Sequence, residues 1–103
     1  MKQPDIYLML IAARELDEMI IDILLERDDI IRRFGSQIID AHGARIGYAN
    51  IAEQVRGRSQ RCEFKLLMAR ADIDGILAAL RERLPRAEIT YWAFPLLAYG
   101  SVN

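Results

Sequence analysis

Hydrophobic and polar residues alternate with two different periods along the chain, and the change of period predicts the order of the elements. Residues 5–12 (DIYLMLIA) are apolar on both faces, as in a strand that is covered on two sides. Residues 14–27 carry apolar side chains at helical spacing and acidic side chains on the other side. The apolar stripe consists of Leu16, Met19, Ile20, Ile23 and Leu24. The first quarter of the chain therefore predicts a strand followed by an amphipathic helix.

Two further strands are predicted on either side of a long loop. Residues 30–41 indicate a strand with a bend at Gly35, and Ile38 and Ile39 are its firmest positions. Residues 62–68 (CEFKLLM) alternate, so that every second side chain shares one face. These side chains are Cys62, Phe64, Leu66 and Met68. The loop between the two strands spans residues 43–60.

The last part of the chain repeats the order of helix and strand. Residues 72–84 have an apolar helical stripe, and Pro85 ends the helix because proline cannot continue it. The stripe consists of Ile73, Ile76, Leu77, Leu80 and Leu84. Residues 88–94 (EITYWAF) are β-branched and aromatic, which favours a strand stopped by Pro95. Residues 96–103 fit either a strand or a loop.

The resulting order is β-α-β-β-α-β, which is the ferredoxin-like arrangement of an α+β protein. In that arrangement an antiparallel sheet carries both helices on one face, within a single domain over residues 1–103. The first strand is apolar on both sides, so either Tyr7, Met9 and Ile11 or their alternates must lie on the face without helices, together with Trp92 or Tyr91. An apolar face of that extent is usually a protein interface, so we expect self-association.

Composition supports a folded protein of the cytoplasm. The chain has 103 residues, of which 52% are hydrophobic, so it can build one modest core. No apolar run reaches the roughly 18 residues that a membrane-spanning helix needs. A single cysteine excludes an internal disulfide framework and suits a reducing compartment. We therefore expect a cytoplasmic location.

Charge is concentrated in residues 42–61 (HGARIGYANIAEQVRGRSQR). This segment carries four arginines against one glutamate in a chain whose net charge is −1. Guanidinium groups bind phosphate and carboxylate with two parallel hydrogen bonds, so the segment is a candidate site for an anion or an acidic partner. The candidate binding residues are His42, Arg45, Glu53, Gln54, Arg56, Arg58 and Arg61, with Tyr91 and Trp92 as walls of a cleft. The alternative is a solvated basic loop that forms ion pairs with the acidic first helix.

Within the loop, Asn50 and Glu53 have the spacing of a capping box, which predicts a single helical turn over residues 51–55. Metal binding would recruit His42, the only histidine, together with Cys62 and carboxylates. The chain offers no C-x-x-C motif and no second histidine, so Cys62 is better explained as a small buried apolar residue. His42 is then a polar loop residue.

Other functions of this fold predict motifs that the chain does not have. An RNA-recognition domain carries a glycine- and aromatic-rich run on its third strand, whereas this chain has RCEFKLLM there. A heavy-metal chaperone domain has a cysteine pair after its first strand, where this chain has AARE. No nucleophile and base stand at an obvious spacing. We therefore expect neither nucleic-acid binding nor enzymatic activity.

Several stretches resemble the PII-like superfamily of trimeric signalling proteins. DAHGARIG at 40–47 is similar to the start of their long loop, and RCEFKLLMARADIDGILAAL at 61–80 to their third strand and second helix. A closer resemblance is to an uncharacterised PII-like family that is often encoded beside bacterial heavy-metal efflux pumps. The stretches that carry it are NIAEQVRGRSQR at 50–61, ILAALRERLP at 76–85 and ITYWAFPLL at 89–97.

The resemblance implies a homotrimer with ligand clefts between subunits, a cytoplasmic regulatory role and a partner in a membrane efflux system. It implies no catalytic activity and no particular cofactor. Nucleotide-binding PII proteins have a glycine- and lysine-rich turn after the second helix, and LPRAE at 84–88 departs from it, which argues against ATP.

Sequence alone thus indicates a non-enzymatic PII-like regulator or sensor that binds a small anion, a metal ion or a partner through residues 42–61. The alternative is a protein that buffers or delivers a metal through His42 and carboxylates. A third, remoter class is a small enzyme that acts on a phosphorylated substrate.

Overall fold

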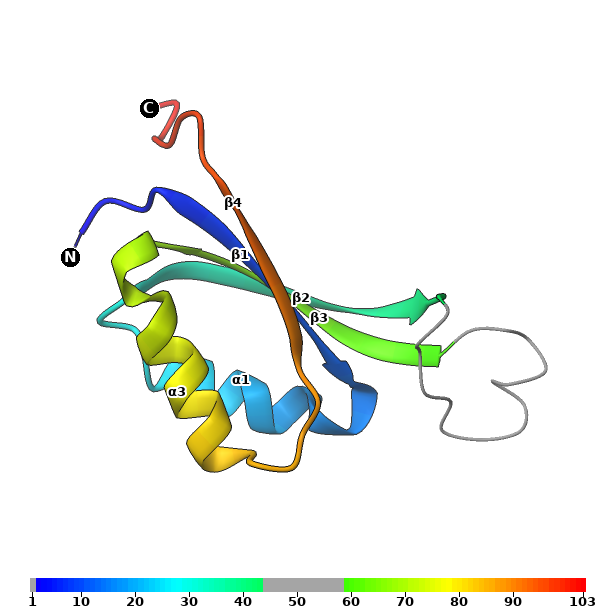
Figure 1. Ribbon diagram of the computed structural model, residues 1–103. Helices are drawn as coiled ribbons and strands as arrows, with labels where there is room; N and C mark the ends of the chain where they lie inside the picture. The colour runs from blue at the N-terminus through cyan, green and yellow to red at the C-terminus, as the bar shows by residue number, and fades with distance from the viewer. Residues whose placement is uncertain (1, 44–58) are drawn as a thin grey trace.

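In the computed structural model, which describes residues 2–43 and 59–103, four antiparallel strands form one sheet in the order β2-β3-β1-β4 (Figure 1). The strands are β1 (Ile6–Ala13), β2 (Ile31–Ala41), β3 (Ser59–Met68) and β4 (Thr90–Pro95). The helices are α1 (Asp17–Leu25) and α3 (Ile73–Arg83), each preceded by a 3-10 turn, η1 (Arg14–Leu16) and η2 (Arg70–Asp72). Both helices cover the same face of the sheet (Figure 1). The predicted ferredoxin-like α+β fold is therefore confirmed.

The core lies between this face of the sheet and the two helices. Alternation in β3 sends every second side chain inward, and each has an inward-facing partner on β1, such as Phe64 opposite Leu10 and Leu66 opposite Leu8. Ile20 and Leu24 from α1, with Ile76 and Leu80 from α3, close the other side of the core. As predicted, the inward set of β3 is Cys62, Phe64, Leu66 and Met68, all at most 1% exposed.

The helices are shorter than the sequence pattern predicts, because their first turns are 3-10 turns. The first helix begins at Asp17 rather than residue 14, and it ends at Leu25 before a turn. The second helix ends at Arg83, two residues before Pro85, as its missing N–H requires. Neither helix in residues 2–43 and 59–103 is long and apolar enough to cross a membrane.

Two details of β2 and β3 differ from the prediction. The register shift in β2 falls between Ile31 and Arg33, before the glycine where a bend was predicted, and Gly35 itself pairs regularly with Lys65. Strand β3 begins three residues earlier than expected, at Ser59, because Ser59 pairs with Ala41 at the end of the β2–β3 ribbon.

Strand β4 begins at Thr90 and includes Pro95 instead of stopping before it. It pairs only with β1, so it is an edge strand, where a proline without an N–H is tolerated.

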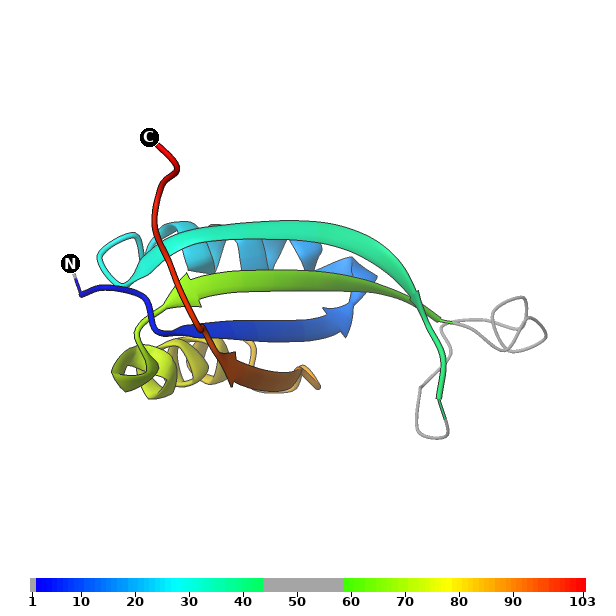
Figure 2. The same ribbon diagram turned by 90° about the horizontal axis from the view of Figure 1, so that it is seen from above.

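The face of the sheet without helices is seen from above in Figure 2. By register and alternation, Tyr7, Met9 and Ile11 of β1 lie on this face beside Trp92 and Phe94 of β4. The rings of Tyr7 and Phe94 meet edge to face, with centroids 5.5 Å apart. We call this surface the apolar half-face. The sequence left two alternatives open for this face, and the structure selects Tyr7, Met9 and Ile11 with Trp92. Tyr91 lies on the helix side.

The neighbouring half of the same face, on β2 and β3, is polar. The Gln37 amide donates a hydrogen bond of 2.8 Å to Glu63, and the Lys65 ammonium lies 3.6 Å from the same carboxylate. Arg33 continues this polar row, because it pairs with Leu67 in the register of β2 and β3. One face of the sheet thus combines an apolar half and a charged half.

Candidate functional site

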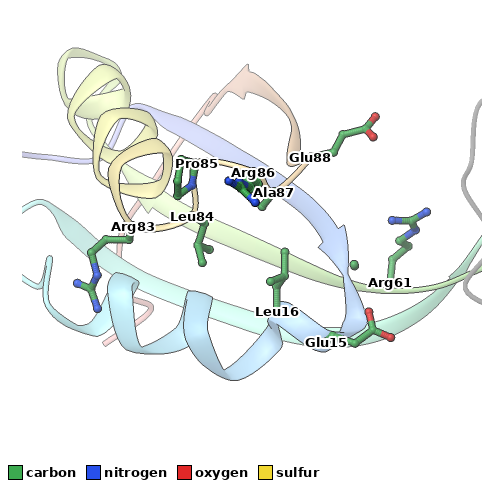
Figure 3. Close-up of a pocket in the computed structure, with 10 residues that line it drawn as sticks. Glu15, Leu16, Arg61, Arg83, Leu84, Pro85, Arg86, Ala87 and Glu88 are labelled. Carbon is green, nitrogen blue, oxygen red and sulfur yellow. The ribbon is translucent and has the colours of Figure 1, made fainter.

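A cavity of about 570 Å³ lies at the end of the sheet where β1 ends, β3 begins and the chain leaves α3 (Figure 3). Its lining comes from three segments that are far apart in the sequence. These lining residues are Ala13, Glu15, Leu16, Arg61, Arg83, Leu84, Pro85, Arg86, Ala87 and Glu88. We refer to this cavity as the arginine cleft.

The fold brings these segments together by simple geometry. Strands β1 and β3 are antiparallel, so the end of β1 meets the start of β3, where Arg61 pairs with Ala13. Helix α3 returns along the sheet after β3, so its last turn reaches the same end. There Leu84 donates its amide proton to the Leu80 carbonyl at 2.8 Å, and Ala87 donates to the Leu84 carbonyl at 3.1 Å. This turn directs residues 84–88 across the mouth of the cleft.

The charges of the cleft are mixed, with three guanidinium groups and two carboxylates. The Arg83 guanidinium points away from the cleft (Figure 3) and forms an ion pair of 2.9 Å with Glu26 of the segment after α1. Arg61 enters from β3, at the same end of the cleft as Glu15 and Glu88 (Figure 3). Arg61 and Arg86 are the other two arginines that line the cleft.

The rest of the lining is apolar. It is formed by the side chains of Ala13, Leu16, Leu84, Pro85 and Ala87. Leu16 and Leu84 also pack against the hydrophobic core, so this wall is held rigidly. A cavity with an apolar wall and a few charged groups at one end suits a small ligand that has an apolar or planar body and a charged group.

The structure places only some of the predicted site residues in this cleft. Arg61 lines it. His42 is exposed and directly follows β2. The remaining predictions in the basic loop, including its capping box, fall on residues outside the described ones: Arg45, Asn50, Glu53, Gln54, Arg56 and Arg58.

The two aromatic residues that were predicted as cleft walls lie on opposite sides of the sheet. Trp92 stands opposite Met9, four residues from Ala13 along β1, or roughly 13 Å from the arginine cleft. Tyr91 instead lines a second groove of about 300 Å³ beside α3, with Leu77 and Leu80. Within one protomer, therefore, neither aromatic residue joins Arg61.

Sequence reasoning missed Glu15, Arg86 and Glu88 as cleft residues. The stretch LPRAE drew attention only because it lacks a glycine-rich turn. Glu15 was one of the acidic residues on the solvent-exposed side of the first predicted helix. The topology could have identified them, because the ends of β1 and α3 must meet at the start of β3 in a β-α-β-β-α-β order.

Cys62 is an apolar residue of the core and not a part of the cleft. It is fully buried, and its thiol donates weakly to the Ala13 carbonyl at 3.3 Å. The pKa of the thiol is raised from 9.0 to about 11, chiefly because burial desolvates the thiolate, and also because the carboxylates of Asp17 and Glu15 repel it. The prediction that Cys62 is a small buried residue of the core is confirmed by its complete burial.

Among residues 2–43 and 59–103, no three histidine, cysteine, aspartate or glutamate side chains gather as a metal site would require.

The fold of the chain is shared with PII-like proteins. A putative PII-like signalling protein from Thermus thermophilus is 18% identical, with a TM-score of 0.58 over 91% of this chain and 88% of that one. CPII, a nitrogen regulatory PII-like protein from Thiomonas intermedia, has a solved structure bound to ADP, AMP and bicarbonate. It is 12% identical, with a TM-score of 0.62 over 96% of this chain and 97% of that one.

The family is shown by a more specific match. Residues 2–103 match the family described as "protein of unknown function (DUF3240)", so the chain belongs to that family. The crystal structure of a DUF3240 family protein from Shewanella baltica is 22% identical, with a TM-score of 0.78 over 99% of this chain and 100% of that one. A comparison of the sequence with curated proteins found no match. The resemblance to PII-like proteins is thus confirmed at the level of the fold.

The raised pKa of Cys62 predicts a loss of stability at high pH. Unfolding returns the thiol to its ordinary pKa of 9.0, so the unfolded chain releases this proton before the folded one does. The contribution of Cys62 to the free energy of unfolding is therefore complete below pH 9 and falls by roughly 2–3 kcal/mol between pH 9 and pH 11.

Urea unfolding of the wild type and of Cys62→Ala across this range isolates the effect, because all other titrating groups are shared. The wild type should lose more stability than the variant as the pH rises. Parallel pH curves for the two proteins would contradict the account.

Proposed function

We propose that this protein is a non-enzymatic PII-like regulatory protein that binds a small anionic ligand in the arginine cleft and works as a homotrimer. The fold, which it shares with PII-like signalling proteins, supports a ligand-binding regulatory role. The single observation that carries the proposal is the approach of Arg61 and Arg86 to one cavity with an apolar wall.

The chemistry of the cleft defines the class of ligand. A phosphate or carboxylate group would bind the guanidinium groups of Arg61 and Arg86 through charge-assisted hydrogen bonds. The carboxylates of Glu15 and Glu88 would accept hydrogen bonds from N–H or O–H groups of the ligand. The apolar wall of the cleft, which includes Leu16 and Leu84, would cover an apolar or planar body. A small nucleotide or a comparable heterocyclic anion has all three features.

The size of the anionic group follows from the turn after α3. LPRAE has no glycine, so it cannot bring several backbone N–H groups close to a chain of phosphates. The ligand should therefore carry one or two anionic groups instead of a triphosphate. The PII-like relative from Thiomonas intermedia, which holds ADP, AMP and bicarbonate, makes these three compounds the first candidates.

The absence of catalysis is part of the proposal. The described lining residues carry guanidinium, carboxylate and apolar groups but no hydroxyl, thiol or imidazole. Such a lining can hold a ligand, but it offers none of the usual side-chain nucleophiles apart from carboxylates. Binding of the ligand would instead change which partner the protein contacts.

A cytoplasmic location and a link to a heavy-metal efflux system rest on the family resemblance. In this proposal the ligand-bound protein would contact the efflux system, and the basic residues 42–61 would take part. A metal ion bound at His42 is the competing ligand, and copper and zinc therefore belong in the same titrations as the anions.

The apolar half-face predicts that the chain self-associates, and the family resemblance implies three copies. Sedimentation equilibrium at micromolar concentration should give a mass of about three times 11.8 kDa. The physical reason is that Trp92 and Phe94 are 43% and 45% exposed in the single chain, and association would remove them from water. A monomer at the highest soluble concentration would contradict the proposed assembly.

Truncation of the cleft arginines should weaken anion binding. Each charge-assisted hydrogen bond contributes roughly 1.5–3 kcal/mol, so Arg61→Ala or Arg86→Ala should lower the affinity about tenfold to a hundredfold. Isothermal titration calorimetry with AMP, ADP, bicarbonate and phosphate measures this change directly.

Arg81→Ala is the matched control, because Arg81 is an exposed arginine near the end of α3 that does not line the cleft. It removes the same charge and should leave the affinity unchanged. If Arg81→Ala and Arg86→Ala lower the affinity equally, the loss comes from the net charge of the protein and not from the cleft, which would contradict the proposal. If copper or zinc binds in place of all four anions, and His42→Ala abolishes that binding, the metal alternative replaces the proposal.

A further inference from the structure

Residues 96–103 (LLAYGSVN) form a C-terminal arm that contains neither helix nor strand. The arm holds no charged side chain, and its two large aliphatic residues beyond Leu96 are fully exposed, Leu97 at 102% and Val102 at 99%. Scattered exposed apolar residues are common on protein surfaces, but complete exposure of both in one short segment is a pattern that association would remove.

Specific contacts hold the arm in place across the sheet. The Leu96 amide donates a hydrogen bond of 3.0 Å to the Asp5 carbonyl, just before β1. The Arg32 Nε donates to the Tyr99 hydroxyl at 3.0 Å, and the Arg32 guanidinium lies 5.7 Å from the centre of the Tyr99 ring. Because Arg32 belongs to β2 at the opposite edge of the sheet from β4, the arm crosses from one edge to the other (Figure 2).

The arm leaves the sheet on its helix-free side, which also carries the apolar half-face (Figures 1 and 2). The contacts at Leu96 and Tyr99 hold the segment between them in place. Leu97 lies in this segment and is fully exposed, so it does not cover Trp92 or Phe94, which are 43% and 45% exposed. A single chain therefore presents two apolar surfaces, and its own anchoring contacts keep them apart.

We propose that the C-terminal arm docks on a second copy of this chain, with Leu97 and Val102 packed against Trp92 and Phe94 of that copy. The inference rests on the self-association in the proposed function and names the element that makes the contact. Arm and half-face are different surfaces, so the contact is heterologous, and such contacts form a closed ring when the rotation between copies closes.

Charge favours this occupant. An arm without charged side chains can cover Trp92 and Phe94 without burying an unpaired charge. Docking of the arm on the polar half of the same face would instead bury the charges of Arg33, Glu63 and Lys65. A second copy also supplies one arm for every half-face, so the two surfaces match in number.

The first test compares two double variants that lose similar exposed side chains. Leu97→Ser with Val102→Ser removes the apolar groups of the arm. Met19→Ser with Leu25→Ser is the matched control, because both residues are exposed on α1, on the helix side of the sheet. Sedimentation equilibrium should show association at least roughly a hundredfold weaker in the arm variant, since two apolar anchors are lost, and an unchanged constant in the control.

The second test locates the docking site. A photo-reactive benzoylphenylalanine at position 97, in a mixture of isotopically heavy and light chains, should form cross-links between chains to β1 or β4. Cross-links within one chain only, or to α1 or α3, would overturn the proposal.

Association that is equally strong in the arm variant would overturn it as well, and so would a monomeric wild type. The proposed ligand function is measured separately by the calorimetric titrations. A wild type that assembles through the arm but binds none of the tested ligands would refute that function and leave the docking of the arm intact.

Discussion

The constraint on which the rest of the structure depends is that both helices cover the same face of a four-stranded sheet. One side of β1, with Leu8 and Leu10, gains a complete core from this arrangement, and the other side, with Tyr7 and Met9, gains none from helices. A strand that is apolar on both sides is stable in water only if something covers its second side. In the single chain, Trp92 and Phe94 of β4 provide part of that cover and remain half exposed themselves.

The same arrangement creates the arginine cleft. Antiparallel pairing places Arg61 of β3 beside Ala13 at the end of β1, and the return of α3 brings Arg86 and Glu88 to that end. Cleft and apolar half-face are thus two results of one topology, and they are separated along β1. A ligand in the cleft would contact Arg61, which is the last residue of the basic segment 42–61.

The sequence predicted the strands and helices and their layers better than it predicted the residues at which each element begins and ends. Alternation and helical spacing identified every strand and helix of the described residues, because burial imposes those periods directly: Phe64 and Leu66 on β3 illustrate it. The ends depend on local hydrogen bonds that no period encodes. Ser59 pairs with Ala41 and lengthens β3, and the irregularity in β2 comes before Arg33 although a glycine stands nearby at Gly35.

The candidate site was less predictable than the fold. Charge density identified Arg61, because a cluster of arginines is visible in the sequence. Arg86 and Glu15 were missed, because each is an ordinary surface residue until the fold brings it to the cleft. Cys62 was assigned correctly as a core residue, since its alternation with Phe64 placed it inside. Trp92 was one of two residues predicted for the helix-free face, where it lies, and it does not line this cleft as predicted.

The central claim is that a second copy of the chain covers the apolar half-face, and the only tryptophan of the chain, Trp92, lies on that surface. Acrylamide quenching of its fluorescence, measured over a series of protein concentrations, tests the claim most directly. The account predicts weak quenching in the assembled protein and a rise in quenching when dilution separates the copies. Quenching at the level of a half-exposed indole at every concentration would contradict it.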